Sequence, residues 1–282
     1  MNGIDCASTL NATNAQALKN ASIEAVGRYI CGNYGITAAE AKAILDAGLK
    51  MWLIFELNPT YSGYFYYAKG FSDAHEAVSE AESLGVPEGV GIYFTVDYDA
   101  QSGDMDEIIA YFEGVKAGLK GKYLVGAYGS YSVMEALAAS NFAPDLYFQT
   151  YAWSAGKQFS GNHIYQYQND TEVAGISVDL DQVSENGGLW ANEEEEEKLD
   201  HAVMYFTVND FSIAKVVADK LGGCAMFCRN ASNTNIHADA KSAKHLVVIG
   251  GADVTDHSNV TNCCGLDAPA TAILAAQYAQ TL

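Results

Sequence analysis

Residues 51–56 read Met-Trp-Leu-Ile-Phe-Glu, five apolar residues followed by one carboxylate. A strand with one face in water alternates apolar and polar side chains, whereas a strand of a parallel sheet is covered on both faces and is apolar throughout. The stretch therefore predicts a strand that is buried on both faces and ends at Glu56.

Similar strands alternate with helical patterns on either side of this stretch. Further strands are predicted at residues 3–6, 26–30, 91–96, 123–127, 146–150, 163–166 and 176–180. Helices are predicted at residues 13–22, 37–45, 73–84, 104–119 and 132–139. Repeated strand–helix units imply a parallel sheet, and eight strands can close into a barrel. We predict an α/β fold that begins with a trimmed (β/α)8 TIM-like barrel, since the last strands leave little room for helices; the alternative is an open doubly wound sheet.

A run of five glutamates, residues 193–197, marks the clearest boundary in the 282-residue chain. Like charges in a row repel and stay solvated, so residues 191–201 are predicted to form an acidic linker. We expect it to join a barrel domain, residues 1–190, to a small α/β domain, residues 202–282. The small domain has predicted strands at residues 203–208, 225–228 and 245–249, and helices after residue 209 and at residues 267–282.

Charge and composition exclude several classes of function. The net charge of −20 is the reverse of what a nucleic-acid-binding protein needs. No apolar run approaches the roughly 18 residues of a membrane span. The first ten residues lack the features of a secretory signal, so we expect synthesis in a reducing cytoplasm. The six cysteines are then expected to be buried thiols, with a disulfide or a metal site as the alternative.

Carboxylates follow or end several of the predicted strands. They are Asp5, Glu56, Asp97, Asp99, Asp179 and Asp181. The carboxyl ends of parallel barrel strands meet at one mouth, and residues two apart on a strand share a face, so Asp97 and Asp99 are both expected there. Crowded carboxylates raise each other's pKa, and glycoside hydrolysis needs one protonated and one ionised carboxyl group. The alternative is a solvated acidic rim or a cation site.

Aromatic and amide side chains lie near the same strand ends. The predicted substrate-binding residues are Tyr61, Tyr128, Gln149, Tyr151 and Gln166, and further stacking faces for sugar rings are expected from Trp52, Tyr64 and Trp153. No Walker loop, GxSxG or HExxH motif is present in the sequence, so we expect neither a cofactor nor a metal in the reaction.

Five of these segments, in order and spacing, resemble motifs of the glycoside hydrolase family 25 lysozymes. They are Gly3–Asp5, Ile92–Asp99, Gly126–Gly129, Tyr165–Tyr167 and Val178–Leu180. The resemblance is closer to the glycoside-hydrolase-like domains of the DUF1906 group, which share the lysozyme barrel. In the lysozymes the fourth strand ends in Asp-x-Glu and the Glu is the catalytic acid. Here the triplet is Asp97-Tyr98-Asp99, so the resemblance implies that Asp99 is the acid, with Glu56 able to compensate and with Asp5, Asp97 and Asp179 as the other active-site carboxylates.

The C-terminal part resembles the small cell-wall-binding domains of clostridial phage endolysins, through residues 213–221 and 245–251. Together the resemblances imply a phage endolysin, a muramidase that hydrolyses glycosidic bonds of bacterial peptidoglycan and binds a wall polymer. Such an enzyme would stay in the host bacterial cytoplasm until a holin releases it to the cell wall. The alternatives are a non-catalytic carbohydrate-binding barrel and a bacterial cell-wall remodelling enzyme.

Met204 lies just after the predicted acidic linker, at the start of the first predicted strand of the small domain. An internal start there would give a second product that carries the small domain alone. Such a fragment could join the full chain as a homo-oligomer through this domain, because so small a unit gains stability by association. The alternative is that Met204 is an ordinary core residue.

Overall fold

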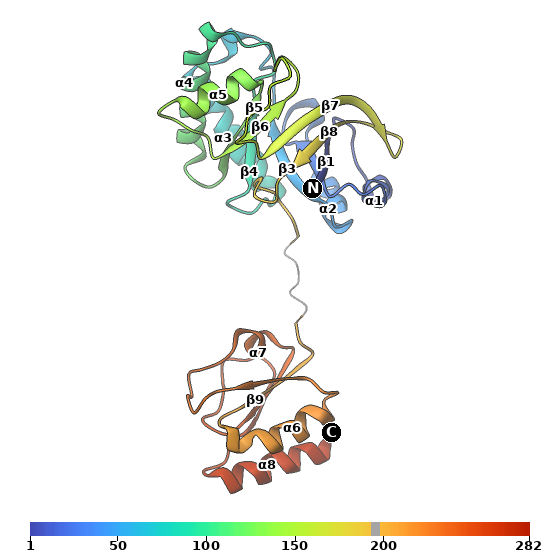
Figure 1. Ribbon diagram of the computed structural model, residues 1–282, viewed down its shortest axis with the longest axis vertical. Helices are drawn as coiled ribbons and strands as arrows, with labels where there is room; N and C mark the ends of the chain where they lie inside the picture. The colour runs from blue at the N-terminus through green and yellow to red at the C-terminus, as the bar shows by residue number, and fades with distance from the viewer. Residues whose placement is uncertain (193–197) are drawn as a thin grey trace. The chain divides into compact units, whose positions relative to one another are not determined.

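The protein is described by a computed structural model that covers residues 1–192 and 198–282. The chain divides into two compact units, Met1–Glu193 and Glu194–Leu282 (Figure 1). The glutamates of the predicted linker, residues 193–197, lie outside the described residues. Among the helices of the described ranges, none is both long and apolar enough to cross a membrane.

The first unit is a closed barrel of eight strands that follow one another in chain order, as the sequence predicts. The strands are β1 (Asn2–Asp5), β2 (Ala25–Tyr29), β3 (Lys50–Phe55), β4 (Gly91–Thr95), β5 (Leu124–Gly129), β6 (Leu146–Thr150), β7 (Ile164–Val173) and β8 (Ile176–Val183). The helices follow the first five strands and are α1 (Ala12–Asn20), α2 (Ala38–Asp46), α3 (Tyr67–Leu84), α4 (Met105–Leu119) and α5 (Tyr131–Ala139). Short 3-10 turns precede three of them, at Gly32–Tyr34, Ser62–Tyr64 and Ser102–Asp104.

The barrel is not parallel throughout, because β8 runs antiparallel to both of its neighbours, β1 and β7. Only Ala174 and Gly175 separate β7 from β8, with φ values of 53° and 79°. Two consecutive residues with positive φ are typical of a tight hairpin turn, whereas a parallel neighbour needs a crossover of about a dozen residues or more. The prediction of eight parallel strands is therefore wrong for the last one.

The largest side chain in the barrel interior is that of Trp52, which is fully buried and packs there with Tyr93 and Phe148. A Cβ atom at Gly27 would lie 2.4 Å from its indole ring, and one at Gly3 would lie 3.1 Å from it. Glycine at these two strand positions leaves the space that the indole fills. The ring also meets Phe148 edge-on, with 6.0 Å between ring centroids. Trp52 therefore supports the barrel from inside, and the prediction that it offers a stacking face for sugars is wrong.

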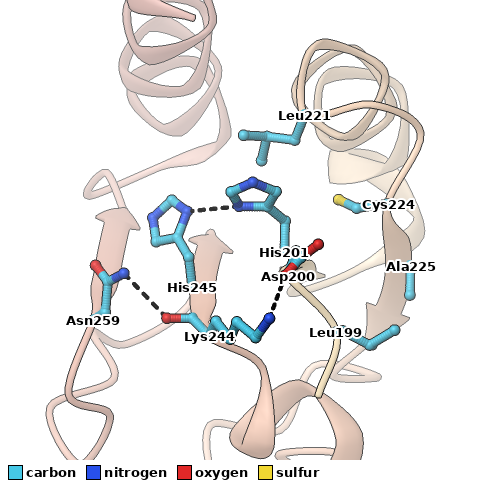
Figure 2. A pocket seen from close by; sticks show the side chains of 9 residues that line it. All are labelled: Leu199, Asp200, His201, Leu221, Cys224, Ala225, Lys244, His245 and Asn259. Carbon is cyan, nitrogen blue, oxygen red and sulfur yellow. Dashed lines mark hydrogen bonds and ion pairs between the residues drawn. The ribbon is translucent and has the colours of Figure 1, made fainter. Parts of the chain in front are cut away.

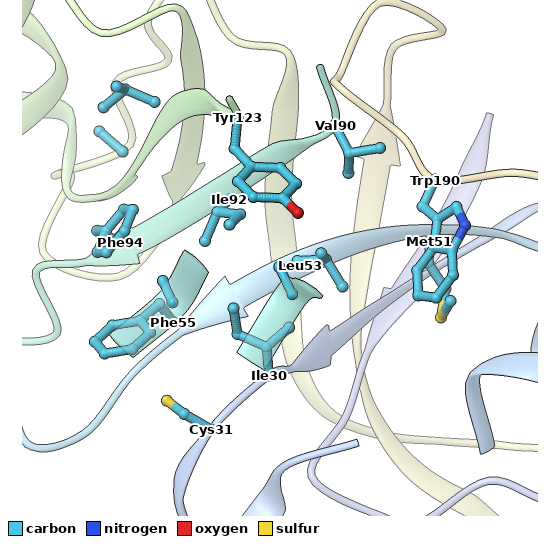
Figure 3. Close-up of a cluster of buried hydrophobic side chains, with 14 of the residues drawn as sticks. Ile30, Cys31, Met51, Leu53, Phe55, Val90, Ile92, Phe94, Tyr123 and Trp190 are labelled. Carbon is cyan, nitrogen blue, oxygen red and sulfur yellow. The ribbon is translucent and has the colours of Figure 1, made fainter. Parts of the chain in front are cut away.

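A second cluster of buried apolar side chains, besides the one inside the barrel, lies between the strands and the surrounding helices (Figure 3). Met51, Leu53 and Phe55 of β3 belong to it, whereas Trp52 and Ile54 belong to the cluster inside the barrel. Since β3 contributes to both clusters, it is buried on both faces, as its apolar sequence predicts.

The second unit is an open sheet of four parallel strands in the order β10-β9-β11-β12. Its strands are β9 (His201–Tyr205), β10 (Ala225–Cys228), β11 (His245–Ile249) and β12 (Val260–Cys263), and its helices are α6 (Phe211–Lys220), α7 (Ala238–Ser242) and α8 (Ala268–Thr281). Helices α6 and α8 cover one face, and α7 covers the other (Figure 1). Strand β12 and helix α7 are not predicted from the sequence; both are short, and β12 (Val-Thr-Asn-Cys) has no continuous apolar run.

Met204 is fully buried and is the fourth of five residues in β9, the strand that pairs with both β10 and β11. The prediction that Met204 opens this strand is wrong. A product beginning there would lose the first three residues of β9, so it would not carry the complete sheet.

All six cysteines are unpaired. Cys6, Cys31 and Cys263 are buried, and burial raises the pKa of each thiol. Buried neutral thiols behave as small apolar side chains, which is the role that the sequence analysis favoured.

A buried ion pair joins β2 to α2 and holds the loop between β1 and α1 against both. Arg28 Nε lies 3.0 Å from Glu40 Oε1, and both side chains are almost fully buried. Glu40 Oε1 also accepts a hydrogen bond of 2.8 Å from the backbone of Leu10, while Arg28 donates to the carbonyl of Cys6.

We expect Glu40→Ala to lower the free energy of unfolding by about 3–5 kcal/mol, because it leaves the Arg28 guanidinium buried and unpaired. The matched control is Lys42→Ala on the same helix, whose exposed pair with Asp46 should contribute less than about 1 kcal/mol. Urea unfolding of both variants measures the difference. Equal small losses would show that Glu40 has no such role.

Candidate active site at the barrel mouth

A cavity of about 180 Å³ lies at the end of the barrel where the parallel strands finish. It is lined by Asp5, Tyr29, Ile54, Glu56, Thr95, Asp97, Tyr128, Phe148, Gln166, Asn169 and Asp179. Four of the five predicted catalytic residues are among them, and so are two of the five predicted substrate-binding residues. The mouth is therefore acidic, as expected from the strand ends.

Gln166 connects the carboxylates that meet across the β7–β8–β1 junction. Its side-chain Nε2 donates to Asp5 Oδ2 at 2.8 Å and to Asp179 Oδ2 at 3.1 Å. The hydroxyl of Tyr128 donates to Gln166 Oε1 at 3.1 Å. Because the donors and the acceptor of this amide are occupied by the protein, Gln166 orients the carboxylates. Its predicted direct role in holding a sugar hydroxyl has no support from this geometry.

Asp5 has a second carboxylate beneath it, that of Asp181. On β8, Asp179 pairs with Asp5 and Asp181 pairs with Gly3, so Asp181 lies one layer deeper in the barrel. Asp181 is 1% exposed, and neither of its carboxylate oxygens has a hydrogen-bond partner among the described residues. Burial, followed by the charges of Asp5 and Asp179, raises the pKa of Asp181 well above its usual range.

The pKa of Asp5 is raised to about 7, mainly by burial and then by the charge of Asp179. Two carboxyl groups this close and this buried cannot both ionise at low cost. The floor of the mouth therefore holds protons at neutral pH.

Glu56 and Asp97 form the outer part of the acidic mouth and are both half-buried. The pKa of Glu56 is raised to about 7, mainly by burial and then by the charge of the nearby Asp97. The pKa of Asp97 is raised as well, by burial and by Asp179. The site thus places a carboxyl group that keeps its proton near neutral pH beside a second carboxyl group, and glycoside hydrolysis uses such a pair.

Asp99 does not belong to this cluster. The strand β4 ends at Thr95, so the alternation that was expected to direct both Asp97 and Asp99 into the mouth no longer holds at residue 99. The side chain of Asp99 is exposed and does not line the cavity. The geometry therefore does not support Asp99 as the acid that the resemblance implies.

Gln149 does not line the cavity, because it lies on the outward face of β6. The inward residues of this strand are Leu146, Phe148 and Thr150, so the side chain of Gln149 points to the other side. Gln149 accepts from the backbone of Phe159 at 2.7 Å and donates to the carbonyl of Lys157 at 2.8 Å. It therefore anchors the loop that follows β6 instead of facing the substrate.

Exposed aromatic rings are carried by the segments that follow the strand ends. Trp153 and Tyr151 are each 44% exposed on the loop held by Gln149, and Tyr61 is 53% exposed after β3. Trp153 has a φ of 55°, and Ala155 has a φ of 49°, a strained conformation for residues other than glycine. Tyr64, by contrast, is buried and donates to Asp73 at 2.7 Å, so its predicted stacking role is wrong.

The sequence does not predict five residues of the cavity wall: the apolar Ile54 and Phe148, and the polar Tyr29, Thr95 and Asn169. Tyr29 and Thr95 are the last residues of β2 and β4, so the strand-end rule would have found both if it had been applied to uncharged side chains. Asn169 lies in β7 beside a register shift between Gln168 and Thr171, and no sequence signal marks that irregularity.

The described residues contain no group of three or more His, Cys, Asp and Glu side chains that is arranged to hold a metal ion.

The first unit is similar to proteins of a known family. Residues 16–186 match the family model described as Rv2525c-like, glycoside hydrolase-like domain. The uncharacterized protein YbfG of Bacillus subtilis is 35% identical over 184 residues, which cover 59% of this chain and 25% of YbfG. A second uncharacterized protein of Bacillus subtilis, FadG, is 31% identical over 173 residues, covering 57% of this chain and 29% of FadG. The chain thus spans between a quarter and a third of the length of these relatives.

The barrel also has a counterpart among solved structures. The Mycobacterium tuberculosis Tat-secreted protein Rv2525c, in complex with L-tartrate, is similar with a TM-score of 0.59 and 19% identity, covering 67% of this chain and 98% of that chain. At this identity the similarity supports the fold, a TIM-like barrel.

We expect Asp181→Asn to stabilise the protein, and more at pH 8 than at pH 5. A carboxyl group whose pKa is raised by folding contributes its stability below its unfolded pKa and loses it as the pH rises through the folded pKa. The amide cannot ionise, so the variant should escape this loss and raise the Tm at pH 8 by roughly 2–4 °C per kcal/mol of relieved repulsion. Glu113→Gln, an exposed carboxylate on α4, is the control. A Tm difference independent of pH would contradict the assignment.

Proposed function

The chain belongs to the family of Rv2525c-like, glycoside hydrolase-like domains, and from this membership and the acidic mouth we propose that the barrel hydrolyses glycosidic bonds of bacterial peptidoglycan. The observation that carries the proposal is the pair formed by Glu56 and Asp97. Glu56 lines the cavity, is partly accessible and keeps its proton to about pH 7. It is therefore placed to act as the general acid toward the leaving oxygen.

The other carboxylates supply negative charge to the same cavity. Asp97 and Asp179 both line it and are half-buried. Either can stabilise the positive charge that develops at the anomeric carbon or activate a water molecule there. Asp5 is nearly inaccessible and is held by Gln166, so it tunes its neighbours rather than meeting the sugar.

The second unit is proposed to bind the cell wall, which makes the whole chain an endolysin-type muramidase. The support is its resemblance to clostridial phage wall-binding domains over residues 213–221 and 245–251. Its nearly neutral composition, 6 acidic and 5 basic residues over residues 201–282, differs from that of the acidic barrel and fits a separate binding role.

A non-catalytic carbohydrate-binding barrel is the second candidate. The observation that favours it is Asp99, which stands where the related lysozymes have their catalytic Glu and which is exposed outside the cavity.

Glu56→Gln should lower the rate of peptidoglycan hydrolysis by at least about 10²-fold, because the amide keeps the shape but cannot donate the acid proton. Asp99→Asn, the matched control, should stay close to the parent rate. In the parent, the rate should fall as the pH rises through about 7, since Glu56 then loses its proton. Release of reducing sugar from purified walls is the measurement. Loss of activity in Asp99→Asn alone would move the acid to Asp99, and wall binding without any turnover would favour the binding barrel.

Trp153→Ala should weaken substrate binding, because the exposed ring stands on a strained loop on the mouth side of the barrel. We expect KM to rise roughly 2- to 10-fold with little change in kcat, the range of an aromatic contact of ~0.5–1.5 kcal/mol. Phe71→Ala, at an exposed aromatic residue of α3 whose ring packs at a tilt against His75, is the control. A fall in kcat with an unchanged KM would instead place Trp153 in the chemical step.

A further inference from the structure

The sheet of the second unit has a topological switch point between β9 and β11. The chain passes from β9 to β10 on one side and then returns to β11 on the other side of β9. The connections after these two strands lie on opposite faces, because α6 after β9 packs on one face while Val254, in the connection after β11, packs on the other. In open parallel sheets this arrangement leaves a crevice beyond the carboxyl ends of the strands, and ligands bind there.

A crevice of about 390 Å³ is found at this place, within the size range of small-molecule sites. It is lined by Phe206, Thr207, Asn209, Asp210, Asn233, Gly250, Gly251, Gly265, Leu266, Asp267, Ala268 and Thr271. All of these residues follow the carboxyl ends of the four strands. The crevice is therefore assembled from every connection at this edge of the sheet.

The fully buried Arg229 holds the loops that line the crevice by hydrogen bonds to their backbone carbonyls. Its guanidinium donates to the carbonyls of Ala252 at 2.8 Å and Ser232 at 3.3 Å, and also to that of Asn233. Gly251, with a φ of 75°, permits a close approach, since a Cβ atom there would lie 2.5 Å from the ring of Phe206. The loops after β10 and β11 are thus fixed before any ligand arrives.

The charges of the lining argue against an anionic ligand. In phosphate-binding folds the anion sits at the start of the helix that follows the first strand. Here the Asp210 carboxylate occupies that position and accepts from the backbone of Thr207 at 2.9 Å. Asp267 is the N-cap of α8 and accepts from the backbone of Ala270 at 2.8 Å. No Lys, Arg or His side chain is among the lining residues.

The remaining groups suit a neutral polyhydroxyl compound. The side chain of Asn209 is exposed and makes no hydrogen bond within the described residues, so its amide is free to donate and accept. The Asp210 and Asp267 carboxylates accept from hydroxyl groups, and Phe206 and the fully exposed Leu266 offer apolar surface to the C–H face of a sugar ring.

A larger cavity, of about 530 Å³, lies at the opposite edge of the same sheet (Figure 2). Its polar groups are already paired with one another: Asp200 with Lys244 at 2.7 Å, and His201 with His245 at 3.2 Å. It also lies at the amino ends of the strands, where the switch-point rule places no ligand.

We propose that the crevice beyond β9 and β11 binds one neutral sugar unit of a polysaccharide. The proposal deepens the wall-binding role proposed for the second unit, on which it rests for the source of the sugar.

The test is a titration of the ¹⁵N-labelled full chain with neutral sugars (N-acetylglucosamine, glucose, galactose, rhamnose and a neutral polysaccharide released from cell walls), and separately with glycerol phosphate. At least one neutral sugar should shift the backbone amides of Gly250, Gly251 and Gly265. Asn209→Ala should weaken this binding about tenfold, by removing hydrogen bonds worth ~1.4 kcal/mol. Val208→Ala, the exposed neighbour outside the crevice, should bind as the parent does.

Shifts with glycerol phosphate alone, or no shift with any of the sugars, would overturn the proposal. Co-sedimentation with purified walls separates it from the proposed function. If the crevice amides stay silent while the parent and Asn209→Ala sediment equally, wall binding stands and the crevice assignment fails. If the amides respond but the chain does not sediment, the crevice stands and wall targeting fails.

Discussion

The antiparallel pairing of β8 with β1 is the constraint on which the candidate site depends. It places Asp179 opposite Asp5 and Asp181 opposite Gly3, so two residues of one strand enter the barrel at successive depths. In a parallel eighth strand, residues 179 and 181 would approach the mouth in the reverse order. The turn at Ala174 and Gly175 enforces the antiparallel direction because it leaves no chain for a crossover.

The depth of each carboxyl group in the barrel then determines how readily it keeps its proton. Asp181 lies in the barrel interior without a hydrogen-bond partner among the described residues. Asp5 lies nearer the mouth and accepts a hydrogen bond from Gln166. Both carboxyl groups are favoured in the neutral form because burial makes their charge costly. Glu56 and Asp97 lie further out, where a proton can be exchanged with a bound molecule and with solvent. Because Asp5 and Asp181 are favoured in the neutral form, Glu56 and Asp97 experience less electrostatic repulsion from the barrel interior.

The two units place their candidate sites by the same physical rule. In the barrel and in the open sheet, polar residues gather where parallel strands end, because the strand interiors are covered on both faces and only the connections are free to vary. The residues gathered in this way differ in chemistry between the barrel mouth and the crevice of the second unit. In the barrel mouth the carboxyl groups lie so close together that they keep protons, whereas the crevice of the second unit combines two carboxylates that also cap helices with amide and apolar surface for a ligand.

The sequence alone determined the number and order of the barrel strands and the carboxylate character of the mouth. Apolar runs such as residues 51–56 and the acidic residues that follow them are local patterns, readable without knowledge of neighbours. Only the tertiary structure decided the direction of β8, the outward face of Gln149 and the exposure of Asp99. Each depends on where a strand ends or pairs, and a shift of one residue reverses the face of a side chain. It also decided that Glu56, rather than Asp99, lines the cavity, because burial and the proximity of Asp97 are properties of packed chains and leave no trace in residue order.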